Sequence, residues 1–318
     1  MRIRLEEINM KKVIVMMSTY NGEKYLEEQI QSILNQKGVE VWLMIRDDGS
    51  TDRTKNILKQ YRSEDGNIML INGKNVGVGA SFMSLLYQSG NADYYAFADQ
   101  DDIWMENKLI EGIKKIESSK KTKSPVLYTS NQMLVDKNAN RIGLRYQAIP
   151  KIDMVNLLND NPFSGCTMIL NRYLRDLLIE KKARPGMNFF TVRIHDAWIA
   201  LFAQCVGRII YDERAFILYR QHEENVVGVK KKTIIRNGKD HIAVLLDRNQ
   251  GNYRSRSACQ LLKNIDEMIV SEDTLEILKL FSELNTFSGR IAFCKSKEIM
   301  KNVRGKNQFR IKAMLGLL

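Results

Sequence analysis

The chain has 318 residues, of which 44% are hydrophobic and 27% charged, a composition typical of globular proteins and not of disordered chains. No apolar run approaches the ~18–20 residues that a membrane-spanning helix needs. Six of the first twelve residues are charged. We therefore expect neither an integral membrane protein nor a secretory signal. The four cysteines, Cys166, Cys205, Cys259 and Cys294, are far apart and form no CxxC pair. This spacing predicts free thiols in a reducing cytoplasm.

The net charge of +12 is concentrated near the end of the chain. Residues 230–318 contain 18 Lys and Arg against 9 Asp and Glu, so residues 1–229 are almost neutral. This asymmetry predicts a globular domain over 1–229 and a basic region over 230–318 that meets an anionic partner. Nucleic acid is one such partner, but its binders usually place aromatic side chains among the basic ones. Tyr253 and Phe309 are nearly alone here, so nucleic acid is not expected.

The first half of the chain alternates short apolar runs with segments that are apolar on one face. Expected strands cover 13–17, 39–45, 68–71 and 94–98, and expected helices cover 23–36, 52–62, 79–88 and 104–118. This alternation predicts an α/β fold with a mostly parallel sheet flanked by helices. Ligands of such sheets bind beyond the carboxyl ends of the strands.

The second half is more mixed. The apolar pattern predicts strands at 126–130, 166–170, 208–211 and 216–220 and a helix at 195–206. After residue 230 the pattern becomes helical, with segments around 242–246, 258–269 and 275–284. The basic region is therefore expected to be a helical extension.

Polar residues follow three of the predicted strands, in the segments STYNG, RDDGSTD and ADQDD. The last two segments bring together several carboxylates, including Asp47, Asp48, Asp99, Asp101 and Asp102. Like charges at this spacing repel unless a cation or hydrogen-bond donors offset them. Mg²⁺ and Mn²⁺ prefer such oxygen ligands, particularly beside substrate phosphates. The alternative is that these residues only form turns and begin helices, as Asp, Gly and Ser often do.

Four motifs in order, STYNG, RDDGSTD, NVGVGASF and FADQDDIW, resemble glycosyltransferase family 2, whose members have the GT-A nucleotide-sugar transferase fold. The resemblance covers about residues 12–228. The later segments NPFSGCTMILNR, HDAW and LYRQHEENVVG are similar to bacterial rhamnosyltransferases of cell-surface polysaccharide synthesis. The resemblance implies a metal-dependent, inverting glycosyltransferase that uses dTDP-L-rhamnose. Transfer of another hexose from a UDP-sugar is the alternative.

The same resemblance assigns roles to individual residues. It implies a nucleotide-sugar site made of Thr19, Tyr20, Asn21, Glu23, Asp47, Asp48, Asn75, Gly77 and Asp99. Asp99 and Asp101 match the DxD motif, which implies that they bind Mg²⁺ or Mn²⁺ and the diphosphate, with Asp102 as a supporting carboxylate. His222 is a further candidate for the metal or the diphosphate, although a histidine after a strand is often only hydrogen-bonded locally.

The pair His195-Asp196 lies at the start of the helix predicted for 195–206 and matches the position of the family's catalytic carboxylate. The resemblance implies that Asp196 takes the proton of the acceptor hydroxyl. The alternative is that Asp196 only caps the helix. The residues implied on the acceptor side are Gly165, Cys166, Thr167, His195 and Trp198. We do not expect Cys166 to be a nucleophile, because no histidine partner is evident and inversion requires none.

The end of the chain combines basic and apolar residues. Residues 301–312 contain five basic and no acidic side chains, and residues 313–318 are almost wholly apolar. Such a segment suits a membrane surface rich in anionic lipid. We expect peripheral contact with the inner face of the plasma membrane, where the resemblance places a saccharide or lipid-linked saccharide acceptor. The alternative is a solvated helical tail.

Overall fold

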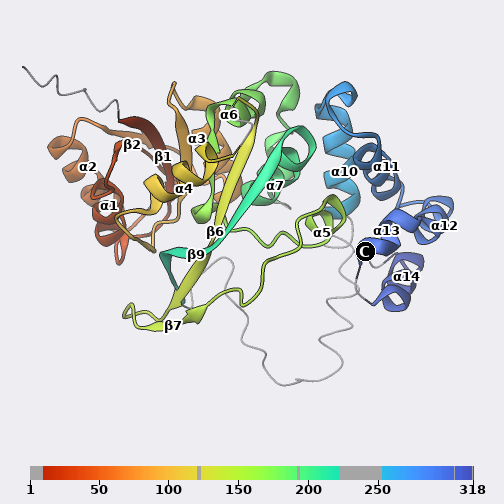
Figure 1. Cartoon of the computed structure of the whole chain (residues 1–318). Helices are drawn as coiled ribbons and strands as arrows, with labels where there is room; N and C mark the ends of the chain where they lie inside the picture. Colours follow the sequence, from red (N-terminus) through yellow and green to blue (C-terminus); the bar gives the residue numbers. More distant parts are fainter. Residues whose placement is uncertain (1–9, 120–122, 192–193, 223–252, 304, 317) are drawn as a thin grey trace, which may run out of the picture.

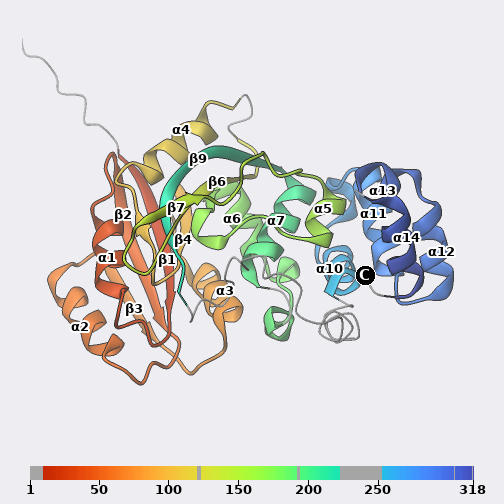
Figure 2. The same ribbon diagram turned by 90° about the horizontal axis from the view of Figure 1, so that it is seen from below.

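The computed structural model describes residues 10–119, 123–191, 194–222, 253–303, 305–316 and 318. The expected helix at 242–246 and the expected boundary at 229/230 lie outside these residues. A sheet of nine strands has helices on both faces, and further helices gather at one end of the molecule (Figures 1 and 2). The expectation of an α/β fold with a helical C-terminal region is confirmed.

The first four strands are parallel and lie in the order β3-β2-β1-β4. They are β1 (Lys11–Thr19), β2 (Val39–Asp47), β3 (Ile68–Asn72) and β4 (Tyr94–Ala98). The chain runs from β1 outward to β3 and then returns to the other side of β1 for β4. This reversal of direction leaves a crevice at the carboxyl ends of β1 and β4, which is where ligands of such sheets bind.

The remaining strands form a mixed sheet with the order β4-β8-β6-β9-β5. They are β5 (Ile103–Trp104), β6 (Val126–Val135), β7 (Arg141–Leu144), β8 (Ile169–Asn171) and β9 (Arg208–Arg220). Strand β8 is antiparallel to both of its neighbours, whereas β6 and β9 are parallel. The two strands expected at 208–211 and 216–220 are one long strand, whose register against β6 shifts on either side of Asn131.

Two other expected boundaries are wrong. Residues 166–170 are not one strand, because Gly165–Thr167 form a tight turn in which the Met168 N–H bonds to the Gly165 carbonyl. Trp104 does not begin a helix: its N–H donates to Ser32 Oγ and it pairs with Ile217 in the sheet. The helix that follows, α4, begins at Lys108.

Helices cover both faces of the sheet and divide the core into two apolar layers. One layer contains α1 (Leu26–Leu34), α2 (Thr54–Glu64) and α4 (Lys108–Glu117), and the other contains α3 (Val78–Gln88), α6 (Arg172–Ile179) and α7 (His195–Val206). Successive side chains of a strand point to opposite faces, so Val15 joins the first layer and Met16 the second. A strand buried on both faces therefore appears in the sequence as a continuous apolar run.

The C-terminal helices are α10 (Tyr253–Asn264), α11 (Glu272–Ser282), α12 (Phe287–Lys295), α13 (Lys297–Asn302) and α14 (Lys306–Met314) (Figure 2). Helices α10, α11 and α13 pack against α5 (Met154–Asn159), and α12 and α14 pack against each other. Leu261, Phe281 and Phe293 are buried in the same cluster as the residues of α7. Within the described ranges, no helix is both long enough and apolar enough to span a bilayer. The four cysteines are free, as expected.

Candidate active site

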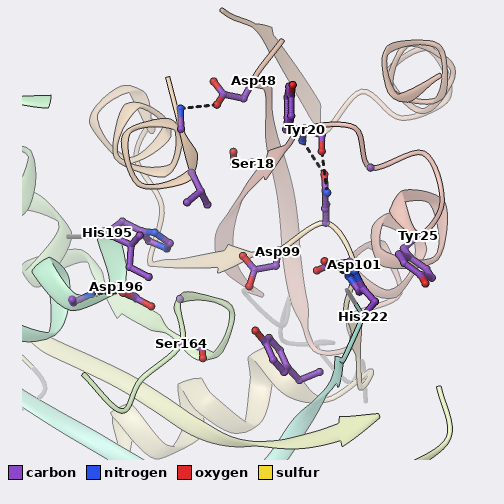
Figure 3. Close-up of a pocket in the computed structure, with 18 of the residues that line it drawn as sticks. Ser18, Tyr20, Tyr25, Asp48, Asp99, Asp101, Ser164, His195, Asp196 and His222 are labelled. Carbon is purple, nitrogen blue, oxygen red and sulfur yellow. Dashed lines mark hydrogen bonds and ion pairs between the residues drawn. The ribbon is translucent and has the colours of Figure 1, made fainter. Parts of the chain in front are cut away.

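A cavity of about 920 Å³ lies at the carboxyl ends of β1 and β4, between the start of α7 and the end of β9 (Figure 3). It brings together eleven of the residues expected at the site: Tyr20, Asn21, Asp48, Asn75, Gly77, Asp99, Asp101, Gly165, His195, Asp196 and His222. These residues extend from Tyr20 to His222 in the sequence and are brought together by the fold. The cavity is therefore the candidate active site.

Carboxylates are concentrated in the middle of this cavity. Figure 3 shows Asp99 between Asp196 on one side and the pair Asp101–His222 on the other. The Asp101 Oδ2 and His222 Nε2 atoms are 2.7 Å apart. Burial, followed by the charges of Asp101 and Asp196, raises the pKa of Asp99 to about 7. Crowded carboxylates of this kind are stabilised when a cation offsets their charge.

The end of β9 is tied to the DxD loop by Arg220, which lies two residues before His222. The Arg220 N–H donates to Asp102 Oδ1 at 3.2 Å, and Arg220 Nε donates to the Asp101 carbonyl at 2.9 Å. Its guanidinium also pairs with Glu28 at 2.6 Å. These bonds fix the position from which His222 reaches Asp101.

The residues present fit a hard divalent cation. Asp102 is buried, and its Oδ2 has no hydrogen-bond partner among the described residues. Burial and the charges of Asp101 and Asp99 raise the Asp102 pKa well above its usual value. Asp99, Asp102 and Cys166 place one potential ligand atom each within 4.8 Å of one another. Burial also raises the pKa of the Cys166 thiol, and hard divalent cations prefer carboxylate oxygen to sulfur, so the two aspartates are the better ligands of the three.

The wall of the cavity where a nucleotide was expected is built from backbone held by Asp48. Its carboxylate accepts the N–H groups of Val76 and Gly77, both at 3.0 Å, and pairs with Arg46. Gly77 has φ +83°, a left-handed conformation that favours glycine. Asn21 also has a positive φ, and its side chain accepts the N–H of Thr51. The two loops thus form one continuous wall.

Three residues expected at the nucleotide site do not line the cavity. Asp47 is fully buried and accepts the Ser50 N–H, so it holds the turn of the DDGS segment. Glu23 accepts the N–H of Arg53 on the outer surface. Thr19 is buried and donates from Oγ1 to Gln100 at 2.6 Å. These three expectations are corrected: the side chains support the wall from behind.

The acceptor side differs from the expectation in a similar way. Gly165 and His195 line the cavity, whereas Cys166 and Thr167 are fully buried beneath it. Thr167 pairs with Thr129 at 2.6 Å. Trp198 follows His195 by about one turn of α7 and is fully buried in the core. Its ring packs edge-on against that of Phe189, with the two ring centroids 5.4 Å apart. The expectation that Trp198 contacts an acceptor is wrong, because α7 turns this side chain away from the cavity.

His195 is packed into the wall as a neutral side chain. Its ring lies 4.2 Å from that of Phe82 and 5.0 Å from that of Phe97. Burial lowers its pKa to about 3, and neither ring nitrogen has a hydrogen-bond partner in the described part of the chain. A side chain on Gly165 would collide with the Nε2 atom, so a glycine is needed there.

Asp196 occupies the first turn of α7, where the partial positive charge of the helix favours a carboxylate. Its Oδ1 accepts the N–H of Ala197, and the residue lines the cavity opposite Asp101 and His222 (Figure 3). The N-cap residue of α7 is Ile194, so Asp196 is not the helix cap that the alternative expected. Its carboxylate bonds within the first turn and lines the cavity.

Several residues of the cavity are not among the site residues named from the sequence, although most of them lie within its motifs. They are Ser18, Gly22, Lys24, Tyr25, Val78, Gln100, Arg145, Asp160, Asn161, Phe163, Ser164, Ile194, Ala197 and Tyr219. Gln100 lies inside the DxD motif, and its amide oxygen accepts the Tyr20 N–H at 2.9 Å. Its position between two carboxylates was a usable signal. Arg145 follows β7 outside any motif, and only the fold brings it to the cavity.

Comparisons with known proteins agree with this geometry. The sequence model described as "Glycosyl transferase family 2" matches residues 14–178, about half of the chain. The chain belongs to glycosyltransferase family 2. The transferase is 31% identical over 226 residues to the dTDP-rhamnosyl transferase RfbG of Shigella flexneri, which covers 67% of this chain and 73% of that protein. It is 30% identical over 164 residues to an Escherichia coli protein named UDP-Glc:alpha-D-GlcNAc-diphosphoundecaprenol beta-1,3-glucosyltransferase WfgD, covering 51% and 61%.

Solved structures share the fold of the transferase. S. aureus TarS 1–349 in complex with UDP has a TM-score of 0.55 at 17% identity, covering 96% of this chain and 80% of that chain. Mannosyltransferase PcManGT from Pyrobaculum calidifontis, in complex with GDP-Man and Mn²⁺, has a TM-score of 0.52 at 14% identity, covering 97% and 86%. The expected GT-A architecture is thereby confirmed.

Proposed function

We propose that the transferase moves L-rhamnose from dTDP-L-rhamnose to a saccharide acceptor, with inversion and with a divalent metal. The observation that carries this proposal is the placement of Asp99, Asp101 and His222 on one side of a single cavity and of Asp196 on the other. A diphosphate leaving group and an attacking hydroxyl need chemistry of these two kinds, at opposite ends of the transferred sugar.

Asp99, Asp101 and His222 would hold Mg²⁺ or Mn²⁺. When bound, the cation would offset the negative charge of the departing diphosphate. The loops of Asn21 and Gly77 would receive the nucleotide. On the other side, the Asp196 carboxylate would accept the proton of the acceptor hydroxyl as its oxygen attacks the anomeric carbon. The buried, neutral His195 would keep the wall beside Asp196 in place without adding a positive charge.

The relatives support the choice of donor and acceptor. RfbG is named a dTDP-rhamnosyl transferase, which favours dTDP-L-rhamnose. WfgD is named for UDP-Glc and for an acceptor linked to diphosphoundecaprenol, which keeps a UDP-hexose as the alternative donor and favours a lipid-linked saccharide in polysaccharide synthesis. The cytoplasm, where nucleotide sugars are made, is the proposed location.

A panel of nucleotide sugars tests this proposal. Purified protein is incubated with dTDP-L-rhamnose, UDP-glucose, UDP-galactose or UDP-GlcNAc. Each incubation contains Mn²⁺, Mg²⁺ or EDTA, and the nucleoside diphosphate that is released is measured. We expect the highest rate with dTDP-L-rhamnose and loss of that rate in EDTA. A UDP-hexose that is turned over faster would replace rhamnose as the donor, and full activity in EDTA would contradict the role of the metal.

We further propose that the C-terminal helices contact the inner face of the plasma membrane. Phe287, Ile311 and Leu315 are exposed, with 67%, 59% and 65% of their surface accessible. The exposed residues Lys306 and Arg310 lie on the same helix as Ile311. Basic and apolar side chains together suit a surface of anionic lipid. A solvated basic surface is the alternative.

A further inference from the structure

Arg145 lines the cavity without a carboxylate partner among the described residues. Arg46, Arg175, Arg214 and Arg220 each contact an Asp or Glu. In the described part of the chain, no carboxylate oxygen lies within the 4.0 Å of an ion pair from the Arg145 guanidinium. Half-buried guanidinium groups without a counter-charge are costly unless a ligand supplies one.

Neutral groups fix this guanidinium in place. One of its nitrogens, Nη1, donates to Gln132 Oε1 at 2.7 Å and to Ser164 Oγ. Gln132 is itself buried and held by Cys166. The Tyr146 ring lies 5.3 Å from the guanidinium and the Tyr219 ring 6.0 Å from it. Uncharged side chains therefore fix the position of this positive charge at the cavity.

Arg145 lines the cavity, and its partner Ser164 shows on which side of it the guanidinium is held. Figure 3 shows Ser164 near Asp196, whereas Asp48 and Tyr20 lie on the far side of Asp99. A positive charge fixed in a cavity attracts a negatively charged ligand group to its own side of that cavity.

We propose that Arg145 forms an anion subsite for the acceptor and binds a carboxylate or phosphate that the acceptor saccharide carries. A guanidinium can contact either group through two parallel N–H bonds, which orients as well as attracts it. This inference rests on the proposed function, because it takes the cavity to be a glycosyl-transfer site. It adds that the acceptor is anionic close to the sugar that is modified.

The experiment measures binding to the chain saturated with UDP and Mn²⁺, using glucose 1-phosphate, glucuronic acid and methyl glucoside as probes in calorimetric or NMR titrations. We expect at least one of the two anionic sugars to bind at least tenfold more tightly than methyl glucoside. Arg145→Gln should abolish the difference, and Arg145→Lys should retain part of it. Arg141→Gln removes the same charge from an exposed position on β7 outside the cavity, and should have no effect.

Three outcomes would overturn the proposal. The wild type could show no preference for the anionic sugars, or the preference could survive in Arg145→Gln. Alternatively, Arg145→Gln could weaken UDP as much as the anionic sugars, which would assign the guanidinium to the donor diphosphate. A parallel series in EDTA separates binding to Arg145 from binding to the metal, because only the former persists. Failure of both dTDP and UDP to bind would instead contradict the proposed function.

Discussion

His195 and Asp196 are neighbours in the sequence, but α7 places their side chains in different surroundings. The His195 ring lies between Phe82 and Phe97, while Asp196 lies at the cavity and within the electrostatic range of Asp99. The sequence alone assigned both residues to function. Their burial now separates a candidate base from a residue that shapes the wall beside it.

Asp196→Asn tests the proposed base. The amide keeps the shape of the carboxylate and its oxygen can still accept the Ala197 N–H, but it cannot accept a proton from the acceptor hydroxyl. We expect kcat to fall by roughly 10²–10⁴, the usual contribution of a general base. The Kd for nucleotide, measured by calorimetry, should stay unchanged. Weaker nucleotide binding together with a normal kcat would instead assign Asp196 to the donor site.

Asp101→Asn tests the metal site. It removes one carboxylate charge and weakens the pairing with His222, so metal-stimulated turnover should fall by roughly 10²–10³, the cost of losing a transition-state electrostatic contact. Asp273→Asn, an exposed carboxylate at the start of α11, is the matched control and should leave turnover unchanged. Equal stimulation by Mn²⁺ in Asp101→Asn and wild type would contradict the assignment.

The buried His195 makes stability depend on pH. Its folded pKa of about 3 lies below the ordinary value of 6.5, so the unfolded chain binds the proton more readily between these values. Stability is therefore lost as pH falls below 6.5, by about 2 kcal/mol at pH 5 from this group alone. Denaturant unfolding in EDTA at pH 8 and pH 5 should show a smaller loss for His195→Gln than for wild type. Equal losses would show that His195 is not buried as a neutral group.

At the scale of elements, the turn at Gly165–Thr167 packs against His195, the first residue of α7. Gly165→Ala would push its new methyl group against His195 Nε2. We expect a loss of stability of roughly 1–3 kcal/mol, typical of overpacking, measured by denaturant unfolding. Gly66→Ala, at an exposed position with open space around it, is the control and should change little. The double variant Gly165→Ala/His195→Ala should recover part of the loss; if it does not, the clash is not with His195.

The sequence predicted the elements best where one apolar pattern decided them. Strands β1 and β4 are largely continuous apolar runs because helices cover both faces there, and α7 has the predicted bounds of 195–206. The two-residue strand β5 is too short for any pattern, and its pairing with β9 depends on residues more than 110 positions away. Local patterns contain no information on such partners.

The site was predicted where a motif followed a strand. Tyr20, Asp48 and Asp99 reach the cavity because the carboxyl ends of parallel strands share one edge. Within a motif, however, alternate residues point in different directions, so Asp47 and Cys166 are buried while their neighbours line the cavity. Arg145 and Asp160 come from connecting segments, and their arrival depends on how the whole chain folds.

On the scale of the whole molecule, the proposed membrane surface gives a test that keeps the core intact. Deleting residues 301–318 would also remove Ala313 and Leu318, which are buried. Substituting the exposed residues Phe287, Ile311 and Leu315 with Ser avoids this. Burying one such side chain is worth about 1.5–3 kcal/mol, so partial insertion of all three predicts that the variant loses roughly tenfold or more in vesicle affinity.

Co-sedimentation with vesicles of phosphatidylglycerol and phosphatidylcholine measures this loss. Binding of the wild type should need the anionic lipid and weaken in high salt, because each Lys or Arg near the surface contributes about 1 kcal/mol. Ile142→Ser alters an exposed apolar residue on β7 and should bind like the wild type. Equal binding to neutral vesicles, or no change in the triple variant, would favour the solvated surface.

Helix α5 connects the two ends of the molecule. The Tyr253 hydroxyl of α10 donates to the Asn159 carbonyl, and Arg254 donates to the Asn159 side chain at 2.9 Å. The next two residues, Asp160 and Asn161, line the cavity. A substitution on α10 can therefore reshape this part of the cavity wall without altering any residue in it. As this transferase diverges toward new acceptors, its C-terminal helices and its catalytic loops are expected to coevolve, and chimaeras that exchange only one of them should inherit a mismatched specificity.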